Sequence, residues 1–447
     1  MSYKPLVLVT APVGTRSGYG SHSRDICRSL IAMDKFDVKI WPVRWGSTPQ
    51  NALSEQNPED KPIIERILDD PNMDRQPDIH FHIVVPNEFQ TMGKYNIGIT
   101  AGLETTVCPP EWLEGLNRMN LNIVPANFIK ESLSKTTFEK HDQNTKQKIG
   151  EIKCEKPIEV LFEGADTNIY KTTKEFSKEL VNELKGIKED FCFLFVGHWL
   201  QGGLGNDRKD LGMLIKTFLE TFKNQKKQPA LLLKTSGASP SILDREDILN
   251  KINEIKNTTE GKLPNVYVLH GDLRDEEMNG LYNHPKVKAH VSFTHGEGFG
   301  RPLLEASLSA KPVIAPNWSG HIDFLSSNAT LLPGSLNDVK KESFPKNMHV
   351  DGAQWFTVNY NYASKTLKDV FDNYSKHIVK AKKLAIVNST KFSLDAMTKK
   401  FEEILDKYLP KFEELPKPVK LNLPKLKKVG SVSEAPKIQL PKLKRVK

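Results

Sequence analysis

Residues 294–321 read THGEGFGRPLLEASLSAKPVIAPNWSGH, and this stretch decides the fold class. Residues 288–293 before it and residues 313–315 within it are predicted to form short buried strands. Between them, Gly298 and Gly300 permit a tight turn and the close approach of a ligand to the backbone. The stretch therefore predicts a strand, a glycine-flanked loop, a helix and a second strand.

The start of this helix is a predicted anion site. Pro302 suits the first helical position, where its missing N–H costs nothing. The free N–H groups of the first turn and the helix dipole favour a negatively charged ligand. Glu297 stands in the loop beside that site, and Glu305 follows eight positions later, inside the helix. This pattern fits a ligand that carries a diphosphate, with one sugar at each glutamate.

The rest of the chain alternates short apolar runs with helical segments, which predicts parallel doubly wound sheets. Strands are expected at 6–10, 36–40, 79–85, 95–100, 122–124, 159–162, 191–197, 230–234 and 266–269. Helices are expected at 21–33, 209–224, 243–256, 275–283, 361–384 and 391–408.

A chain of 447 residues exceeds what one core usually supports. We therefore expect two Rossmann-like α/β domains that face a central cleft. The expected boundaries are 1–170 for an acceptor domain, 171–375 for a nucleotide-sugar domain, 376–409 for helices returning to the first domain, and 410–447 for a basic tail.

The net charge is concentrated in that tail. Residues 416–447 hold ten Lys or Arg and one Glu, which equals the +9 of the whole chain. LPKLKKV at 423–429 recurs as LPKLKRV at 440–446. A regular apolar and basic repeat favours docking to an acidic partner or a nucleic acid over plain solubility.

The spacing of Glu297 and Glu305 resembles the Glu-x7-Glu motif of the retaining glycosyltransferases called glycosyl transferases group 1, which have the GT-B fold. The resemblance covers about residues 5–330 and is strongest at 288–325. It implies that Glu297 contacts the transferred sugar and that Glu305 binds the ribose hydroxyls of a nucleotide-sugar donor. The intervening donor-binding positions are Gly298, Phe299, Gly300 and Arg301.

The segment 197–210 resembles the part of the family that clamps the donor diphosphate. Lys209 matches the lysine of an Arg-Lys pair, whereas His198 replaces the arginine that usually follows the strand glycine. Arg208 or the strand-end Lys234 is expected to supply the second positive charge.

Two loops of the first half resemble the acceptor side of the family. Gly18 and Gly20 form part of a Gly-x-Gly-x-x-Gly pattern whose third glycine is a serine, and Arg16 is an anion contact there. Glu104 lies in a stretch that borders the acceptor, where it either orients an acceptor hydroxyl or serves as a buried, hydrogen-bonded structural residue.

The family resemblance implies transfer on one face of the sugar, so no dedicated nucleophile is required. Catalysis then depends on positioning and on stabilising the leaving diphosphate. No Asp-x-Asp occurs, and the pair His80 and His82 lacks an evident third ligand, so no metal is expected. We expect no cofactor other than the co-substrate, a UDP- or GDP-sugar.

The sequence is compatible with two classes of acceptor. Modified DNA or a protein in a tailed-phage setting would suit the basic tail, whereas a cell-surface polysaccharide or glycolipid needs no tail. A non-catalytic nucleic-acid-binding protein would have no use for the paired glutamates, and a Rossmann oxidoreductase would need the full glycine fingerprint. Four scattered cysteines and the lack of an apolar run of about 18 residues favour a cytoplasmic protein, in the host if it is viral.

Overall fold

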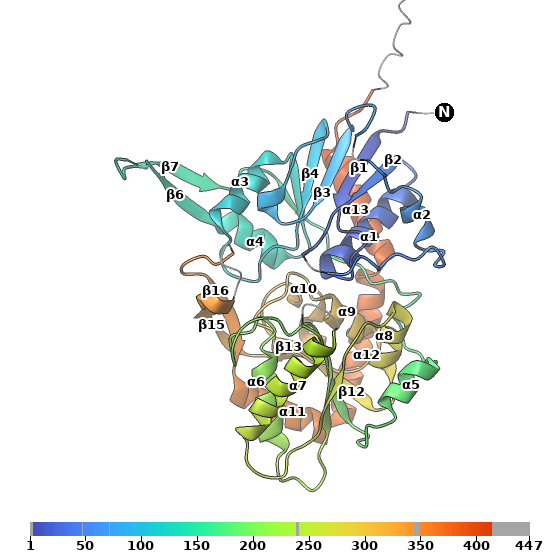
Figure 1. The fold of residues 1–447 in the computed structure, drawn as a ribbon, viewed down its shortest axis with the longest axis vertical. Coiled ribbons are helices and arrows are strands. Elements are labelled where there is room, and N and C mark those ends of the chain that lie inside the picture. Colours follow the sequence, from blue (N-terminus) through green and yellow to red (C-terminus); the bar gives the residue numbers. More distant parts are fainter. Residues whose placement is uncertain are drawn as a thin grey trace, which may run out of the picture.

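The computed structural model describes residues 3–413, except 47, 71, 143, 238–240 and 344–347. The basic stretch 416–447 with its repeated heptapeptide lies outside the described residues. Within them the chain forms two α/β domains, one above the other in Figure 1.

The first domain is built on a parallel sheet in the order β2-β1-β3-β4-β5-β8. Its central strands are buried from end to end, as expected of a sheet covered by helices on both faces. The strands are β1 (Leu6–Ala11), β2 (Asp37–Pro42), β3 (Ile79–Ile83), β4 (Tyr95–Ile99), β5 (Leu121–Val124) and β8 (Ile158–Val160). The helices are α1 (Gly18–Ala32), α2 (Lys61–Ile64), η1 (Pro86–Glu88), α3 (Pro110–Arg118) and α4 (Asn127–Lys135).

The second domain repeats this plan with the order β11-β10-β9-β12-β13-β14, again parallel. Its strands are β9 (Cys192–Val196), β10 (Ala230–Lys234), β11 (Val266–Leu269), β12 (Val287–Val291), β13 (Val313–Pro316) and β14 (Thr330–Leu332). Its helices are α5 (Lys178–Leu184), α6 (Leu211–Phe222), α7 (Ile242–Asn257), α8 (Asp275–Asn283), α9 (Arg301–Leu308), α10 (Ile322–Leu325), η2 (Ser326–Asn328) and η3 (Lys341–Ser343). The prediction of two doubly wound sheets is confirmed.

Two small antiparallel sheets of two strands each were not predicted. β6 (Thr137–His141) and β7 (Lys148–Lys153) project sideways from the first domain (Figure 1). β15 (Gly334–Asp338) and β16 (Gln354–Val358) lie at the boundary between the domains, where the Thr106 N–H donates to the Gln354 carbonyl at 2.9 Å.

The C-terminal helices differ from expectation in one respect. The prediction of a single helix at 361–384 is wrong, because the chain leaves helical geometry at Asn373 (φ −118°). The result is α11 (Tyr360–Asp372) followed by α12 (Tyr374–Lys391), and then α13 (Leu394–Tyr408).

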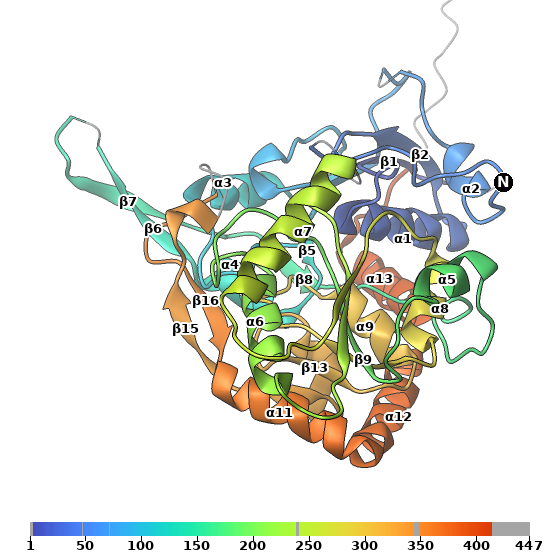
Figure 2. The ribbon, with the colours of Figure 1, turned by 60° about the horizontal axis from the view of Figure 1, so that its bottom comes forward.

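The return to the first domain begins after α12. α12 contacts α9 in the second domain, whereas α13 contacts α1 in the first (Figure 2). The chain crosses where the Ala165 N–H donates to the Phe392 carbonyl at 2.9 Å and the Leu394 N–H donates to the Ala165 carbonyl at 2.8 Å. The expected returning segment 376–409 therefore includes most of a helix, α12, that belongs to the second domain.

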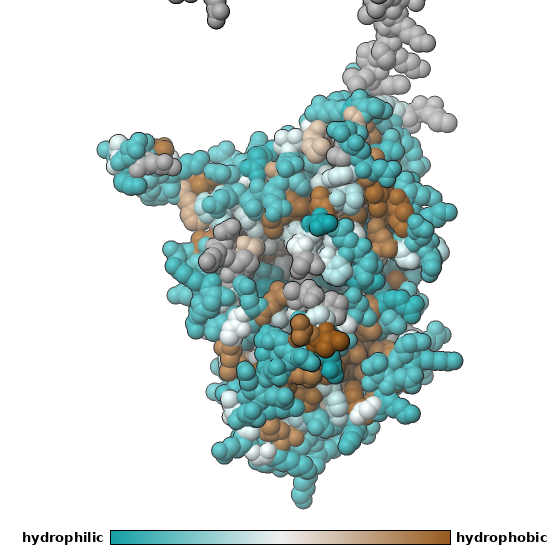
Figure 3. Space-filling model, in the orientation of Figure 1, coloured by the Kyte–Doolittle hydropathy of each residue, from teal (hydrophilic) through white to brown (hydrophobic). Residues whose placement is uncertain are grey.

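The visible surface is largely hydrophilic (Figure 3). An apolar patch on the lower domain lies where α7 begins, and there Ile242 and Leu243 are each 77% exposed. Among the described residues, no helix combines the length and the apolar character needed to cross a membrane.

Candidate functional site

The site residues come from loops that follow the carboxyl ends of strands in both domains. Loops after β9 and β12 contribute from the second domain, and loops after β1 and β4 contribute from the first. In doubly wound folds ligands bind at this edge of the sheet, because the connecting loops and helix starts meet there. The two edges face each other across the domain boundary, where side chains of the two domains make direct contacts.

Two loops of the second domain bring Lys209 and Glu297 together in a buried ion pair. Each residue is only 8% exposed. The Arg208 guanidinium donates to Glu104 Oε1 at 2.7 Å and lies 3.8 Å from Glu297 Oε2. Although burial opposes it, the positive charges of Lys209 and Arg208 hold the pKa of Glu297 below its usual value. Two cations are therefore fixed beside one ionised carboxylate.

The loop that carries Arg208 and Lys209 is held by neighbouring carboxylates. Asp207 accepts from the Leu211 N–H at 3.1 Å, which caps the start of α6. Asp210 has a left-handed backbone (φ 49°) and accepts from the Tyr360 hydroxyl at 2.7 Å. These contacts fix the backbone on both sides of the two cations.

The loop before α9 owes its shape to its glycines. Gly300 has φ +97°, a conformation that glycine adopts without strain. A Cβ at Gly298 would lie 2.5 Å from the Ala101 carbonyl oxygen of the first domain. Gly298 is thus required by the contact between the domains, and its predicted contact with a ligand stays a prediction.

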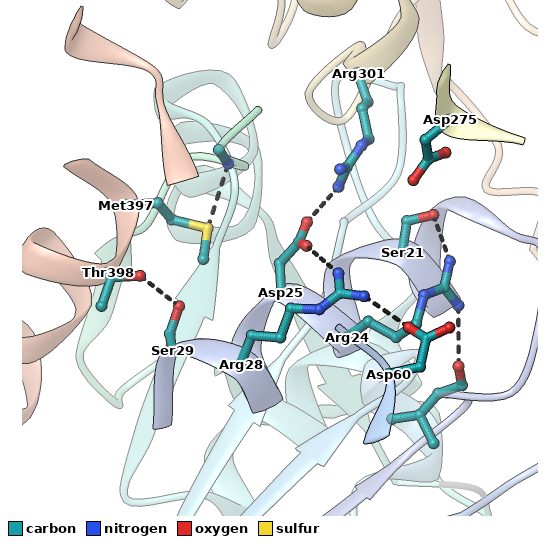
Figure 4. A network of polar contacts seen from close by, with 12 residues as sticks. Ser21, Arg24, Asp25, Arg28, Ser29, Asp60, Asp275, Arg301, Met397 and Thr398 are labelled. Carbon is teal, nitrogen blue, oxygen red and sulfur yellow. Dashed lines mark hydrogen bonds and ion pairs between the residues drawn. The ribbon is translucent and has the colours of Figure 1, made fainter. Parts of the chain in front are cut away.

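Glu305 lies inside α9 and is 7% exposed. Its Oε1 accepts from Arg301 Nε at 2.9 Å, and its Oε2 accepts from the Tyr282 hydroxyl at 3.3 Å. Burial raises the pKa of Glu305 to about 7, although Arg301 acts in the opposite direction. The other end of the Arg301 guanidinium donates to Asp25 of α1 (Figure 4).

His198 and Lys234 lie at the rim of the same region. His198 Nδ1 is 3.2 Å from the Ser236 hydroxyl, and Lys234 Nζ donates to the Gly271 carbonyl at 2.6 Å. Desolvation, followed by the charges of Lys209, Lys234 and Arg208, lowers the pKa of His198. His198 therefore lies near several cations, and Lys234 is tied to the backbone.

The first glycine loop packs tightly on itself. A Cβ at Gly20 would lie 2.1 Å from the Thr15 carbonyl oxygen, whereas one at Gly18 would meet no atom within 4 Å. Arg16 donates to Asn51 Oδ1 at 3.1 Å and lies 4.0 Å from Asp272 of the second domain. Gly20 is therefore a structural requirement of this loop.

Glu104 accepts from Arg208 across the domain boundary, and its predicted role toward an acceptor hydroxyl stays a prediction. Two further acidic residues, Asp25 and Glu163, were missed by sequence reasoning. Both are buried, and burial raises the pKa of Glu163 to about 7. Asp25 is one of many polar residues in a predicted helix, so the sequence carries no signal that it faces the other domain.

No group of three or more His, Cys, Asp or Glu side chains in the described part of the chain is arranged to hold a metal ion. His80 contacts the Thr10 hydroxyl at 3.0 Å, and His82 Nδ1 accepts from the Gln90 N–H at 3.0 Å. These two imidazoles are partnered within the core of the first domain.

Two facing Rossmann-like domains with a last helix that returns to the first define the GT-B fold. HepE of Anabaena, solved with UDP and glucose, matches with a TM-score of 0.56 and 14% identity over 90% of this chain and 100% of HepE. Sucrose-phosphate synthase of Thermosynechococcus elongatus matches at 0.58 and 12% identity over 91% of this chain and 99% of its own. A glycosyltransferase of Rickettsia africae matches at 0.58 and 15% identity over the same shares, 91% and 99%.

No protein-family model matches the chain, and no curated protein matches its sequence. At such identities the structural likeness establishes the fold.

Proposed function

We propose that this protein is a retaining glycosyltransferase that moves a sugar from a nucleotide-sugar donor to an acceptor hydroxyl. The observation that carries the proposal is the convergence of Lys209, Arg208 and Glu297 at the facing edges of the two sheets. Cations fixed in a buried site stabilise the charge that develops on a leaving diphosphate, with no reorganisation at the moment of reaction.

The proposed roles are those that the family resemblance implies. Lys209 and Arg208 bind the diphosphate, Glu297 holds the hydroxyls of the transferred sugar, and Glu305 accepts hydrogen bonds from the ribose. The leaving phosphate oxygen assists in deprotonating the acceptor, so no separate nucleophile is used. UDP is the first nucleotide to test, because HepE has the same fold and was solved with UDP, and GDP is the second.

The decisive experiment measures the binding and turnover of UDP- and GDP-sugars by the purified protein. We expect one nucleotide to stabilise the fold selectively. Lys209→Ala is expected to lower turnover by about 10²-fold, because it removes a charge directed at the leaving group. Lys223→Ala is the matched control, since Lys223 pairs with Glu220 on the surface of the second domain. Full activity of Lys209→Ala would refute the assignment.

For the acceptor we propose modified DNA or a protein in a phage setting, in the cytoplasm, with the 416–447 tail as the tether. The support is that the tail carries the entire net charge of the chain. Phosphate contacts would make such binding strongly dependent on salt. Salt-sensitive DNA binding that persists after deletion of residues 410–447 would contradict the tether and favour the glycan or glycolipid alternative.

A further inference from the structure

Asp25 of α1 contributes a buried carboxylate from the first domain to the nucleotide side of the site. Asp25 is 3% exposed, and its Oδ2 accepts from the Arg301 guanidinium of α9 in the second domain (Figure 4). An ion pair buried between two domains is costly to break, because separation leaves a charge without its partner.

Arg301 is shared between the two domains. Its Nε donates to Glu305 Oε1 at 2.9 Å, while its terminal nitrogen is bound to Asp25. Because the guanidinium is a rigid planar fork, the position of one bound carboxylate determines the direction that the fork presents to the other. The location of Asp25 therefore affects how Glu305 is held.

Asp25 is itself fixed from behind. Arg28 lies 3.5 Å from Asp25 Oδ1 and donates to Asp60 Oδ1 at 2.9 Å. Asp60 is 4% exposed and also accepts from the Ser54 N–H at 3.1 Å. This chain of alternating charges, drawn in Figure 4, anchors Asp25 to the first domain. Asp25 cannot follow Arg301 if the domains separate.

We propose that Asp25 is a positioning residue of the nucleotide site, which acts through Arg301 to orient Glu305 only while the two domains are in contact. The inference rests on the proposed function, in which Glu305 accepts hydrogen bonds from the ribose. Domain closure and nucleotide binding then reinforce each other, as linkage requires of two coupled equilibria.

The charges around Glu305 allow the coupling between Asp25 and nucleotide binding to be measured through the pH dependence of affinity. The groups that face its carboxyl are Arg301 on its own helix, Asp275 and Tyr282 of α8, and Tyr170 and Glu163 of the segment between the domains. An ionised Glu305 accepts hydrogen bonds, so nucleotide affinity falls as the pH drops through its pKa.

Variants of Asp25 and of Arg301 shift the pH midpoint of nucleotide binding in opposite directions. Asp25→Asn leaves more of the Arg301 charge for Glu305, which lowers the pKa of Glu305 and moves the midpoint to lower pH. Arg301→Gln removes the charge and moves the midpoint to higher pH. A general loss of stability would not produce these two opposite shifts, and the double variant tests whether the effect of Asp25 passes through Arg301.

The experiment is calorimetric titration of UDP and GDP from about pH 6 to about pH 8.5 into the wild type, Asp25→Asn, Arg301→Gln and the double variant. We expect Asp25→Asn to weaken affinity by about 10-fold, and to have no added effect in the Arg301→Gln background. Arg301→Lys should restore part of the affinity. Asp34→Asn is the matched control, because the Asp34 side chain, just beyond α1, is 88% exposed.

Each outcome separates the two hypotheses. A wild type that binds no nucleotide refutes the proposed function. If the wild type binds a nucleotide and Asp25→Asn matches Asp34→Asn in affinity and in the pH midpoint of binding, the positioning role alone is refuted. Additive losses in the double variant would show that Asp25 does not act through Arg301. If Arg301→Gln fails to fold, Asp25→Glu replaces it: this variant keeps the charge and must retain the wild-type midpoint.

Discussion

Gly298 lies where the backbones of the two domains meet, and it has no room for a side chain. A Cβ there would stand 2.5 Å from the Ala101 carbonyl oxygen, a contact that only backbone movement can relieve. We predict that Gly298→Ala separates the facing loops slightly and lowers turnover by about 10²-fold, because small misplacements in a catalytic site are costly. The assay is steady-state transfer, with circular dichroism to confirm that the fold is intact.

The matched control for that substitution is Gly186→Ala. Gly186 lies in the turn after α5, and a Cβ there would meet no atom within 4 Å. It should retain wild-type turnover. Equal turnover of both variants would mean that the contact between Ala101 and Gly298 is not needed for activity.

At the scale of elements, α13 links the second domain to the core of the first. Phe401 on this helix is fully buried and meets Phe81 of β3 edge to face, with ring centroids 5.8 Å apart. We predict that Phe401→Ala lowers the free energy of unfolding by about 3–5 kcal/mol, since it removes apolar contacts and leaves a cavity. Denaturant unfolding measures this change.

Ile386→Ala on α12 is the control, because Ile386 is 69% exposed. Its effect should lie within about 0.5 kcal/mol of zero. A small loss for Phe401→Ala would show that α13 is not integral to the first domain. The Thr398 hydroxyl of α13 lies 2.8 Å from the Ser29 hydroxyl of α1, the helix that carries Asp25. The loss of stability in Phe401→Ala should therefore also weaken nucleotide binding.

For the whole molecule, buried ionisable groups determine how stability depends on pH. Burial raises the pKa of several carboxyls, to about 7 for Glu163 and Glu305 and to about 8 for Asp210. Between their unfolded values near 4 and these folded values, the native state binds more protons than the unfolded state. Their contribution to stability therefore declines as the pH rises toward 8.

Buried imidazoles act in the opposite sense. Burial lowers the pKa to about 4 for His22 and His82 and to about 3 for His80 and His290. Below about pH 6.5 the unfolded state binds more protons at these positions, so stability is lost as the pH falls. We predict a melting temperature that is highest near pH 6.5, measured by calorimetry across pH.

Glu163→Gln tests the alkaline side of that profile. It removes a buried group that must ionise, so it should raise the melting temperature at about pH 8 more than at about pH 6. An equal effect at both pH values would show that Glu163 does not titrate in this range.

The sequence by itself determined the two parallel sheets and their main elements. β10, β11 and α8 have the predicted bounds, because each of these strands is a continuous apolar run and a helix start carries capping residues. The sequence also identified Lys209 and Glu297, which are 88 positions apart and which the structure places in contact. Their catalytic roles stay predictions.

Only the tertiary structure decided how the domains engage each other. Asp25 and Arg301 are 276 positions apart, and Glu104 and Arg208 are 104 apart. No local pattern distinguishes a carboxylate that will face the other domain from one that faces water. The two antiparallel strand pairs were missed because β6 and β15 are largely exposed and carry no continuous apolar run. Local periodicity reports the burial of an element within its own domain, whereas contacts between domains depend on where two finished surfaces meet.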